Sequence, residues 1–464
     1  MTAFPHMFAA KVLASGRRSG RRPSPISAIR CSARKALFRS SLCLLASLAT
    51  LEGTAFTQAT PAAVASPIST GFRLPSVQGT LNYSFSVNGI ASTSASLAGG
   101  SGAGTYYGGG IGGSLAFITS SKNHPFSMVA SAGESLAASG QPNTPYYNVA
   151  FSQVLNTRTW HFILSDAPAY LPETPTTGLS GIPGTGDLGI APIQVGANGQ
   201  GLLTTYATRF SNSTSLSASR TLTGRTSFQT TGTYSTLFFI GSSNGGLNTN
   251  TMGISGGISH RISGRTSLSS SYAYSESFYG AGQTNFISQT VSANFSHQFS
   301  PRLSFGLSGG PQWTTYTNTS PAAPTTINIY GSASLSYTAG VTHYSLAYSQ
   351  GTNPGSGVAE GARSNSVNLS ASRPIARVWS TSVFGAYSQS NSLAGSATPF
   401  TAKTIVGGGQ FSRALFRSVS FYASYTLEDQ PETGAPAGGN IFSGVNRVAS
   451  LGLSYSPRSI NLGH

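Results

Sequence analysis

Charge is what this 464-residue chain has least of: Asp, Glu, Lys and Arg together make up 8% of it, against about 25% in a typical soluble domain. Tryptophan is also scarce, with 3 residues, and acidic residues number only 10. No stretch reaches the roughly 20 consecutive apolar residues that a membrane-spanning helix requires. These shortages argue against a soluble domain and a helical membrane protein, and they favour strands in which apolar residues alternate with small polar ones.

Cysteine is missing from most of the chain, because both cysteines, Cys31 and Cys43, lie near its beginning. This excludes a disulfide framework and thiolate catalysis or metal binding in the remainder. A thiol-free chain suits export through an oxidising periplasm. No Gly-rich loop ends in Lys-Ser or Lys-Thr, so the sequence offers no phosphate-binding loop. We expect no cofactor.

The first residues read as an export signal. The basic stretch "ARKALFRSS" precedes an apolar core, Leu42–Leu51, which has the length of a signal h-region. We expect cleavage after Ala59, so that residues 1–59 are an N-terminal extension with a secretory signal peptide and 60–78 a periplasmic linker. An organellar transit peptide is the alternative.

The net charge of +16 does not indicate nucleic-acid binding. Residues 1–52 carry nine basic residues and one acidic residue, so they hold half of the charge. The other half contains no Lys/Arg cluster interleaved with aromatic residues.

The stretch "TVSANFSHQFSPRLSFGLSGG", which begins at Thr290, shows the pattern of the chain. Phe295, Phe299 and Phe305 belong to one alternating set, and serines, glycines and amides fill the other. Period two predicts β-strands, and "SPR" predicts the turn of a hairpin. Because the second face has almost no charge, it fits the wall of a water-filled lumen, with the apolar face in lipid.

The pattern of strand, short polar turn, Arg and strand recurs about every forty residues. Arg225 and Arg265 are 40 residues apart, as are Arg377 and Arg417. A unit of two long strands fits a barrel better than the four-stranded blade of a propeller. Longer segments rich in Gly, Ser, Asn and Pro separate the hairpins. We predict one strand at 79–92, a final strand at 446–457, and between them eight hairpins, which gives 18 strands, with 16 as the alternative. The predicted turns lie near Ser121, Asn156, Thr223, Ser263, Pro301, Gly340, Pro374 and Leu415.

With its signal, its hairpin repeat and its closing "RVASLGLSYSPR", the chain resembles a porin-like outer-membrane β-barrel of Gram-negative bacteria over residues 79–458, with 459–464 as a tail. The resemblance implies an all-β fold: a single transmembrane antiparallel up-and-down β-barrel of about 16–18 strands, with short periplasmic turns and longer external loops. It implies location in the cell outer membrane. The implied partners are outer-membrane lipid, the barrel-assembly machinery during biogenesis, small solutes and, in a homo-oligomer, further copies of the chain.

The segment from Asp166 to Gly201 is the longest irregular one and carries Asp166, Glu173 and Asp187. In porin-like barrels the third external loop often folds inward. Alternation along the next strand predicts that Arg209 faces the lumen. Together these four residues would form a charged pore constriction that sets solute selectivity. The alternative is a disordered surface loop.

Arginines flank the predicted turns and would form a rim at the periplasmic membrane edge. The alternative is a rim that attracts anionic solutes. These residues are Arg158, Arg220, Arg225, Arg261, Arg265, Arg302, Arg373, Arg377, Arg413 and Arg417.

Catalysis finds little support in the sequence. Ser255 and Ser308 match G-x-S-x-G, but both lie in alternating strands and not at the strand-to-helix turn of a nucleophile elbow. His260, His297 and His343 have no metal-binding partners at suitable spacing. We therefore expect no enzyme, but a channel for passive, weakly selective diffusion of small hydrophilic solutes. The alternative is a structural, adhesive or polysaccharide-export barrel without an open pore.

Overall fold

A computed structural model describes residues 79–94, 104–119, 121, 124–137, 144–171, 209–240, 247–280, 285–317, 325–354, 361–393, 401–433 and 444–462. All regular structure in these ranges is β-strand. No helix among the described residues is long and apolar enough to cross a membrane. The strands are β1 (Gly79–Ser94), β2 (Gly104–Thr119), β3 (Phe126–Ala137), β4 (Thr144–Asn156), β5 (Trp160–Asp166), β6 (Ala169–Leu171), β7 (Arg209–Thr221), β8 (Thr226–Phe239), β9 (Thr249–Arg261), β10 (Thr266–Tyr279), β11 (Asn285–Ser300), β12 (Leu303–Thr317), β13 (Thr326–Ala339), β14 (Thr342–Asn353), β15 (Ala362–Pro374), β16 (Trp379–Ser392), β17 (Thr401–Ala414), β18 (Val419–Gln430), β19 (Glu432–Thr433), β20 (Gly444–Tyr455) and β21 (Ile460–Leu462).

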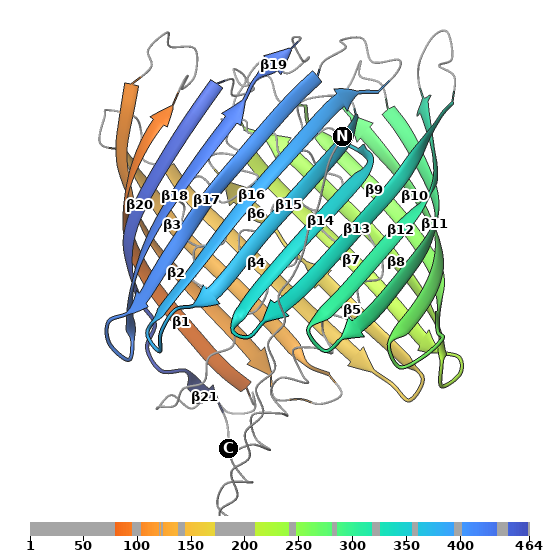
Figure 1. The fold of residues 1–464 in the computed structure, drawn as a ribbon, viewed down its shortest axis with the longest axis horizontal. Coiled ribbons are helices and arrows are strands. Elements are labelled where there is room, and N and C mark those ends of the chain that lie inside the picture. The colour runs from red at the N-terminus through yellow and green to blue at the C-terminus, as the bar shows by residue number, and fades with distance from the viewer. Residues whose placement is uncertain are drawn as a thin grey trace, which may run out of the picture. The chain divides into compact units, whose positions relative to one another are not determined.

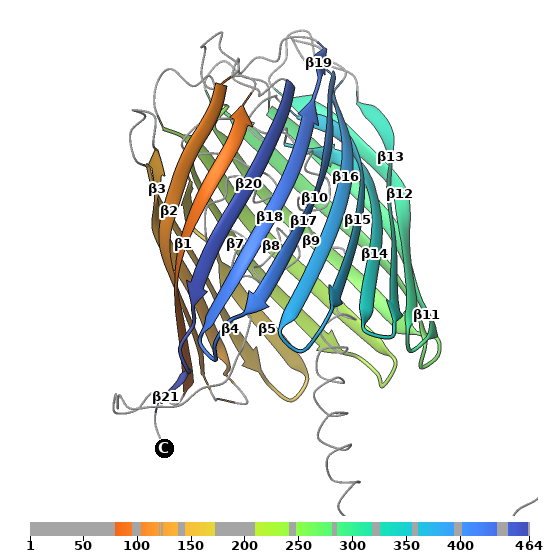
Figure 2. The same cartoon turned by 60° about the vertical axis from the view of Figure 1, so that its left-hand side comes forward.

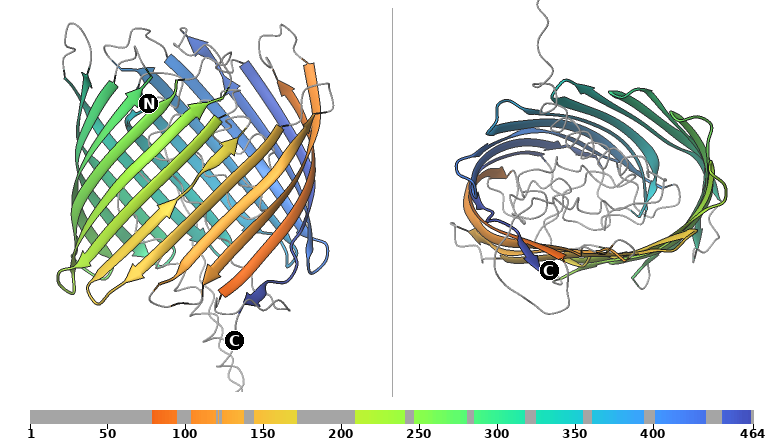
Figure 3. Two further views of the ribbon diagram at one scale, coloured as in Figure 1. Left: turned by 180° about the vertical axis from the view of Figure 1, so that it is seen from behind. Right: turned by 90° about the horizontal axis from the view of Figure 1, so that it is seen from below.

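The strands form one closed antiparallel barrel (Figures 1 and 3). Closure comes from β1 and β20, which pair from Phe85↔Tyr455 to Thr93↔Arg447. Three spans are each divided in two: β5 and β6 share their neighbours, β18 and β19 both pair with β17, and β20 and β21 both pair with β1. Pro168 and Pro431 stand at two of these breaks, where proline supplies no N–H to the ladder. The 21 strands therefore make 18 spans, which confirms the predicted fold class and the higher strand count.

The eight short turns lie where the sequence predicts them, all at one end of the barrel (Figure 2), which we call the short-turn end. The first and last spans also have an end there, since Gly79 pairs with Thr119 and Val419 with Tyr455. Three turns share a hydrogen bond from an arginine amide to the hydroxyl two residues earlier. The bonds run from Arg225 to Thr223, from Arg265 to Ser263 and from Arg302 to Ser300, each at 3.2 Å. This local contact gives the repeated turn sequence a physical reason.

Two boundaries differ from the sequence prediction. Asp166–Leu171 belongs to the wall and not to a loop, because β6 pairs with both β4 and β7. At the other end of the chain, β21 lies within the predicted tail and pairs with Gly79–Leu81 of β1. Since β20 reaches only as far as Phe85 of β1, β21 supplies partners that these backbone groups would otherwise lack.

The two faces of the wall differ as the alternation predicts. The outer face exposes large apolar side chains all around the ring, for example Phe85 (58% exposed), Ile254 (59%) and Leu451 (59%). Phe295 and Phe299 are among them, at 37% and 56%. The buried residues are mostly Ser, Thr, Asn and Gln on the inner face. A closed barrel with an apolar exterior and a polar interior is built for lipid outside and water inside, so this chain is an integral outer-membrane β-barrel.

Candidate functional site: the inner wall of the barrel

Pairs of hydroxyl groups line the inner wall. Residues opposite each other on neighbouring strands point to the same face, and at many such positions both are serine. Each hydroxyl can donate to its partner and accept from it, so the pairs satisfy one another without charge. Pairs with oxygen–oxygen distances between 2.6 and 2.9 Å are Ser84–Ser114, Ser165–Ser215, Ser271–Ser292, Ser308–Ser332, Ser349–Ser366 and Ser424–Ser450.

Among the residues whose side chains the structure describes, the strand register directs three Asp, Glu, Lys or Arg side chains inward: Arg209, Arg261 and Glu428. Arg261 lies at the short-turn end and donates to the carbonyl oxygen of Gly224, at 3.0 Å. Arg209 opens β7 opposite Phe239, and its Nε is buried without a hydrogen-bond partner among the described residues. The described wall is therefore close to neutral.

Glu428 is a pore-facing acid that the sequence analysis did not single out. It is 2% exposed and lies opposite Val406 on one side and Asn446 on the other. Alternation along β18 would have predicted its inward direction. Tyr425 is 50% exposed on the outer face, and Glu428 belongs to the opposite alternating set. The neighbouring Asp429 pairs with Ile405, which is itself 50% exposed, so Asp429 faces outward.

The structure does not bring Asp166 and Arg209 together. Asp166 lies opposite Phe151 and Thr214 on the outer face, and the Thr214 hydroxyl donates to its carboxylate at 2.5 Å. Arg209 has the inward register that the alternation predicts. Glu173 and Asp187 lie outside the described residues. A constriction made by the segment between β6 and β7 therefore stays a prediction.

The predicted rim arginines lie at the short-turn end. Arg225, Arg265, Arg302, Arg377 and Arg417 are in the turns themselves, while Arg220 and Arg261 lie at the ends of strands. Backbone carbonyls in these turns connect one hairpin to the next. The carbonyls of Arg225, Arg265 and Arg302 accept from the amides of Arg261, Gln298 and Thr338, at 2.8 Å each. The described Asp and Glu residues, by contrast, lie in the half of each span that is farther from the short turns.

Two arginines contact tryptophans on the outer face near this rim. Arg220 lies over the ring of its cross-strand partner Trp160, 5.4 Å from the centroid, and Arg413 lies over Trp379 at 4.6 Å. Each tryptophan also contacts a phenylalanine, Phe162 or Phe411. An aromatic ring with a cation beside it suits the boundary between lipid and water.

Ser255 and Ser308 lie within β9 and β12, as the alternation predicts. The Ser308 hydroxyl pairs with that of Ser332 at 2.6 Å, which leaves it as one more member of the inner wall. His260, His297 and His343 each lie within hydrogen-bond distance of a threonine hydroxyl, at 3.0, 2.9 and 3.1 Å. No group of three or more His, Cys, Asp or Glu residues that could hold a metal occurs in the described ranges.

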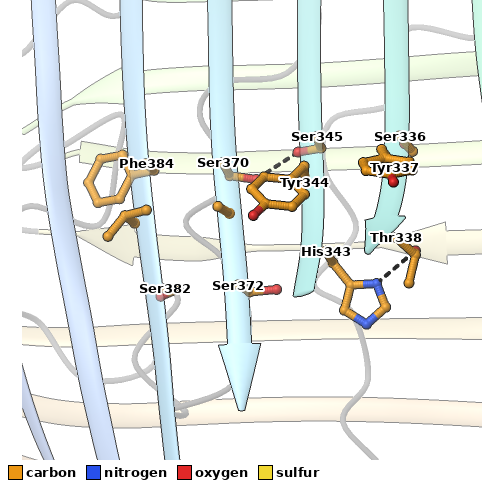
Figure 4. A pocket seen from close by; sticks show the side chains of 12 residues that line it. Ser336, Tyr337, Thr338, His343, Tyr344, Ser345, Ser370, Ser372, Ser382 and Phe384 are labelled. Carbon is orange, nitrogen blue, oxygen red and sulfur yellow. Dashed lines mark hydrogen bonds between the residues drawn. The ribbon is translucent and has the colours of Figure 1, made fainter. Parts of the chain in front are cut away.

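A pocket of about 290 Å³ lies across β13–β16, close to the short-turn end (Figure 4). Its central row consists of Tyr337, Tyr344, Ala371 and Val383, which are cross-strand neighbours. Tyr337, Tyr344 and Val383 are 45%, 43% and 53% exposed on the outer face, and Ala371 is the smallest of the row. The flanking serines have the opposite register. We assign this hollow to the outer face, and it is therefore no part of the lumen.

No family model matches the chain, and no curated protein matches it. Solved structures with a similar fold include OpdK of Pseudomonas aeruginosa with vanillate (10% identity, TM-score 0.43, 82% of this chain and 98% of that chain). OccK9 (OpdG) of the same organism has 11% identity and a TM-score of 0.44 over 82% and 98%. OccAB3 of Acinetobacter baumannii has 8% identity and a TM-score of 0.42 over 82% and 99%. These likenesses are distant and concern the fold alone.

Proposed function

We propose that the protein is a channel for the passive diffusion of small hydrophilic solutes across the outer membrane. The observation that carries the proposal is the neutral, hydroxyl-lined inner wall of a closed barrel of 18 spans. Barrels of 16 to 18 strands leave an aqueous channel, whereas those of eight are filled by their own side chains.

Weak selectivity is the second part of the proposal. Rings of charged side chains are one way in which channels select ions. Here the described wall offers Glu428, Arg209 and Arg261 from three different strands and no ring of one sign. Serine hydroxyls interact with neutral polyols, cations and anions alike, because each is both donor and acceptor.

Liposome swelling tests the proposal. The full chain is exported in a Gram-negative host, purified from the outer membrane and reconstituted into vesicles. Neutral sugars of increasing size should enter at rates that fall with their size, and small charged solutes should enter at comparable rates. Heat-modifiable mobility on gels shows whether the barrel is folded. If a folded barrel gives vesicles that do not swell with any solute, the result would favour a structural, adhesive or export-associated barrel.

A further inference from the structure

The wall of the barrel divides between β13 and β14 at the end opposite the short turns. The ladder between the two strands runs from Ala339↔Thr342 and stops at Gly331↔Gln350. Beyond that point β13 continues for five residues, Thr326–Tyr330, which pair only with β12. On the other side, β14 and β15 remain paired with each other up to Asn353↔Ala362. The outer end of β14 therefore separates from β13, while β14 stays paired with β15 and β15 stays paired with β16 as far as Ala362↔Ser392.

The end of this hairpin lies against the inner face of β12. The backbone amide of Thr352 donates to Oε1 of Gln312 at 2.9 Å, and the Thr352 hydroxyl lies 3.5 Å from that of Thr314. Gln312 also donates from Nε2 to the Ser288 hydroxyl of β11, at 3.0 Å. Gln312 is 0% exposed and Thr314 is 2% exposed. These inward residues of β12 could not meet β14 if β14 had stayed beside β13.

The contacts continue as far as β10. The Tyr279 hydroxyl at the end of β10 donates to the carbonyl oxygen of Pro354, at 2.9 Å. Strands β10 and β14 are four positions apart in the wall, which is roughly 19 Å at about 4.8 Å per strand. One tyrosine side chain does not span that distance, so Pro354, the residue that follows β14, must lie over the inner face of the intervening strands.

Two glycines make this course possible. Gly351 passes over the ring of Tyr330, and a Cβ at this position would lie 3.2 Å from the ring. Gly361 has a φ of +81°, and a Cβ there would lie 2.7 Å from Leu393 and 2.9 Å from Phe286. The left-handed backbone and the close approach both favour glycine. Next to Gly361, the apolar residues Tyr279, Phe286, Tyr316 and Leu393 form a buried cluster.

Polar side chains bridge the place where the wall divides. Gln350 Nε2 donates to the carbonyl oxygen of Ile329 at 3.1 Å, and Arg363 donates to Oδ1 of Asn328 at 3.3 Å. These two bonds give Asn328 and Ile329 hydrogen-bond partners beyond the point where the ladder between β13 and β14 stops. Ile327 and Ile329 are the most exposed isoleucines of the outer face, at 68% and 70%, as expected for a strand that lacks one neighbour.

We propose that residues 351–354 and 361–364 form an inward constriction element of the lumen, for which Gln312 is the positioning residue. The inference rests on the proposed channel function and adds a place where solute size is limited. Gln312 meets the hairpin through its side-chain oxygen and β11 through its side-chain nitrogen. Loss of this side chain leaves the Thr352 amide without its acceptor and releases the element from β12.

Cysteine cross-linking tests the placement without relying on channel activity. The full chain, with Cys31→Ser and Cys43→Ser, receives either Thr314→Cys/Thr352→Cys or Ile329→Cys/Thr352→Cys. The hydroxyls of Thr314 and Thr352 are 3.5 Å apart, within reach of a disulfide after replacement. A regular wall that continued the ladder would instead put Thr352 opposite Ile329. We expect a disulfide in the first pair and free thiols in the second; the reverse result would overturn the inward placement.

Single-channel conductance then tests the role in the pore. Gln312→Ala should give larger and noisier conductance steps than the parent protein. Gln298→Ala is the matched control, because Gln298 has an inward register near the short-turn end of β11 and should leave the steps unchanged. If the first cysteine pair cross-links but Gln312→Ala conducts like the parent, the hairpin folds inward without limiting the pore, and the inference fails. A parent protein that never conducts would instead contradict the proposed channel function, while the cross-link would still report the placement.

Discussion

The backbone amide of Thr352 in β14 donates a hydrogen bond to the side chain of Gln312 in β12, although β13 lies between these strands in the wall. This one contact means that the barrel is a single layer over most of its circumference and a double layer in one sector. In this sector the described wall reaches into the lumen through backbone as well as side chains, so this sector should control the size of the pore.

Alanine substitution of two glycines with positive φ, Gly340 and Gly361, separates backbone strain from steric overlap. Gly361 (φ +81°) lies against Phe286 and Leu393, whereas Gly340 (φ +62°) has open space around its Cβ position. Gly340→Ala should cost about 1–2 kcal/mol for the left-handed conformation alone. Gly361→Ala should cost more and should also change the conductance. Denaturant unfolding in vesicles and bilayer recordings measure the two effects, and equal costs with unchanged conductance would contradict the packing described here.

Adjacent residues of β9 test which face meets lipid. Ile254 lies near the middle of the strand and is 59% exposed, and Ser255 has the inward register. Ile254→Arg should destabilise the folded barrel by about 2–4 kcal/mol, the cost of arginine on the lipid face near the bilayer midplane. Ser255→Arg should leave the unfolding free energy nearly unchanged and shift the ion selectivity toward anions. A larger destabilisation by Ser255→Arg would mean that the faces are assigned the wrong way round.

Neutralisation of Glu428 should change ion selectivity. It is an acidic side chain with an inward register, so Glu428→Gln should shift the reversal potential in a salt gradient toward anion preference. Asp429→Asn is the control, because this carboxylate belongs to the outer face beside Ile405. Equal shifts for both variants would show that the effect comes from the overall charge of the protein and not from the lumen.

The two arginine–tryptophan contacts should stabilise the barrel unequally. Double-mutant cycles with alanine at Trp379 and Arg413, and at Trp160 and Arg220, measure each coupling through unfolding in vesicles. Exposed cation–π contacts contribute about 0.5–1 kcal/mol. The Trp379 pair should give the larger value because its guanidinium is 4.6 Å from the ring centroid, against 5.4 Å for Trp160. Coupling of zero at both sites would leave the arginines as solvated residues of the turns.

Sequence alone predicts the strands, the turns and the two faces, because each depends on local order. Period two fixes which side chains share a face, and the polar turns near Thr223, Ser263 and Pro301 fix where the chain reverses. Alternation also predicts the inward register of Arg209, and applied to β18 it would have predicted that of Glu428.

The inward course of β14 and β15 could not be predicted in this way. Residues 351–361 are rich in Gly and Pro, which indicates a loop but not the side to which it folds. Thr352 and Pro354 are held by Gln312 and Tyr279, which are distant in the sequence. Asp166 shows the same limit: Pro168 suggests a loop, whereas the register of β4 and β7 keeps Asp166 in the wall, on the lipid-facing side.

Planar-bilayer recording of the purified full chain tests the central claim most directly. A closed barrel of 18 spans with a neutral, hydroxyl-lined wall should give stable, ohmic conductance steps with little preference between K⁺ and Cl⁻. If the protein shows the heat-modifiable gel mobility of a folded barrel but gives no conductance steps, the result would contradict the account of the barrel as an open channel.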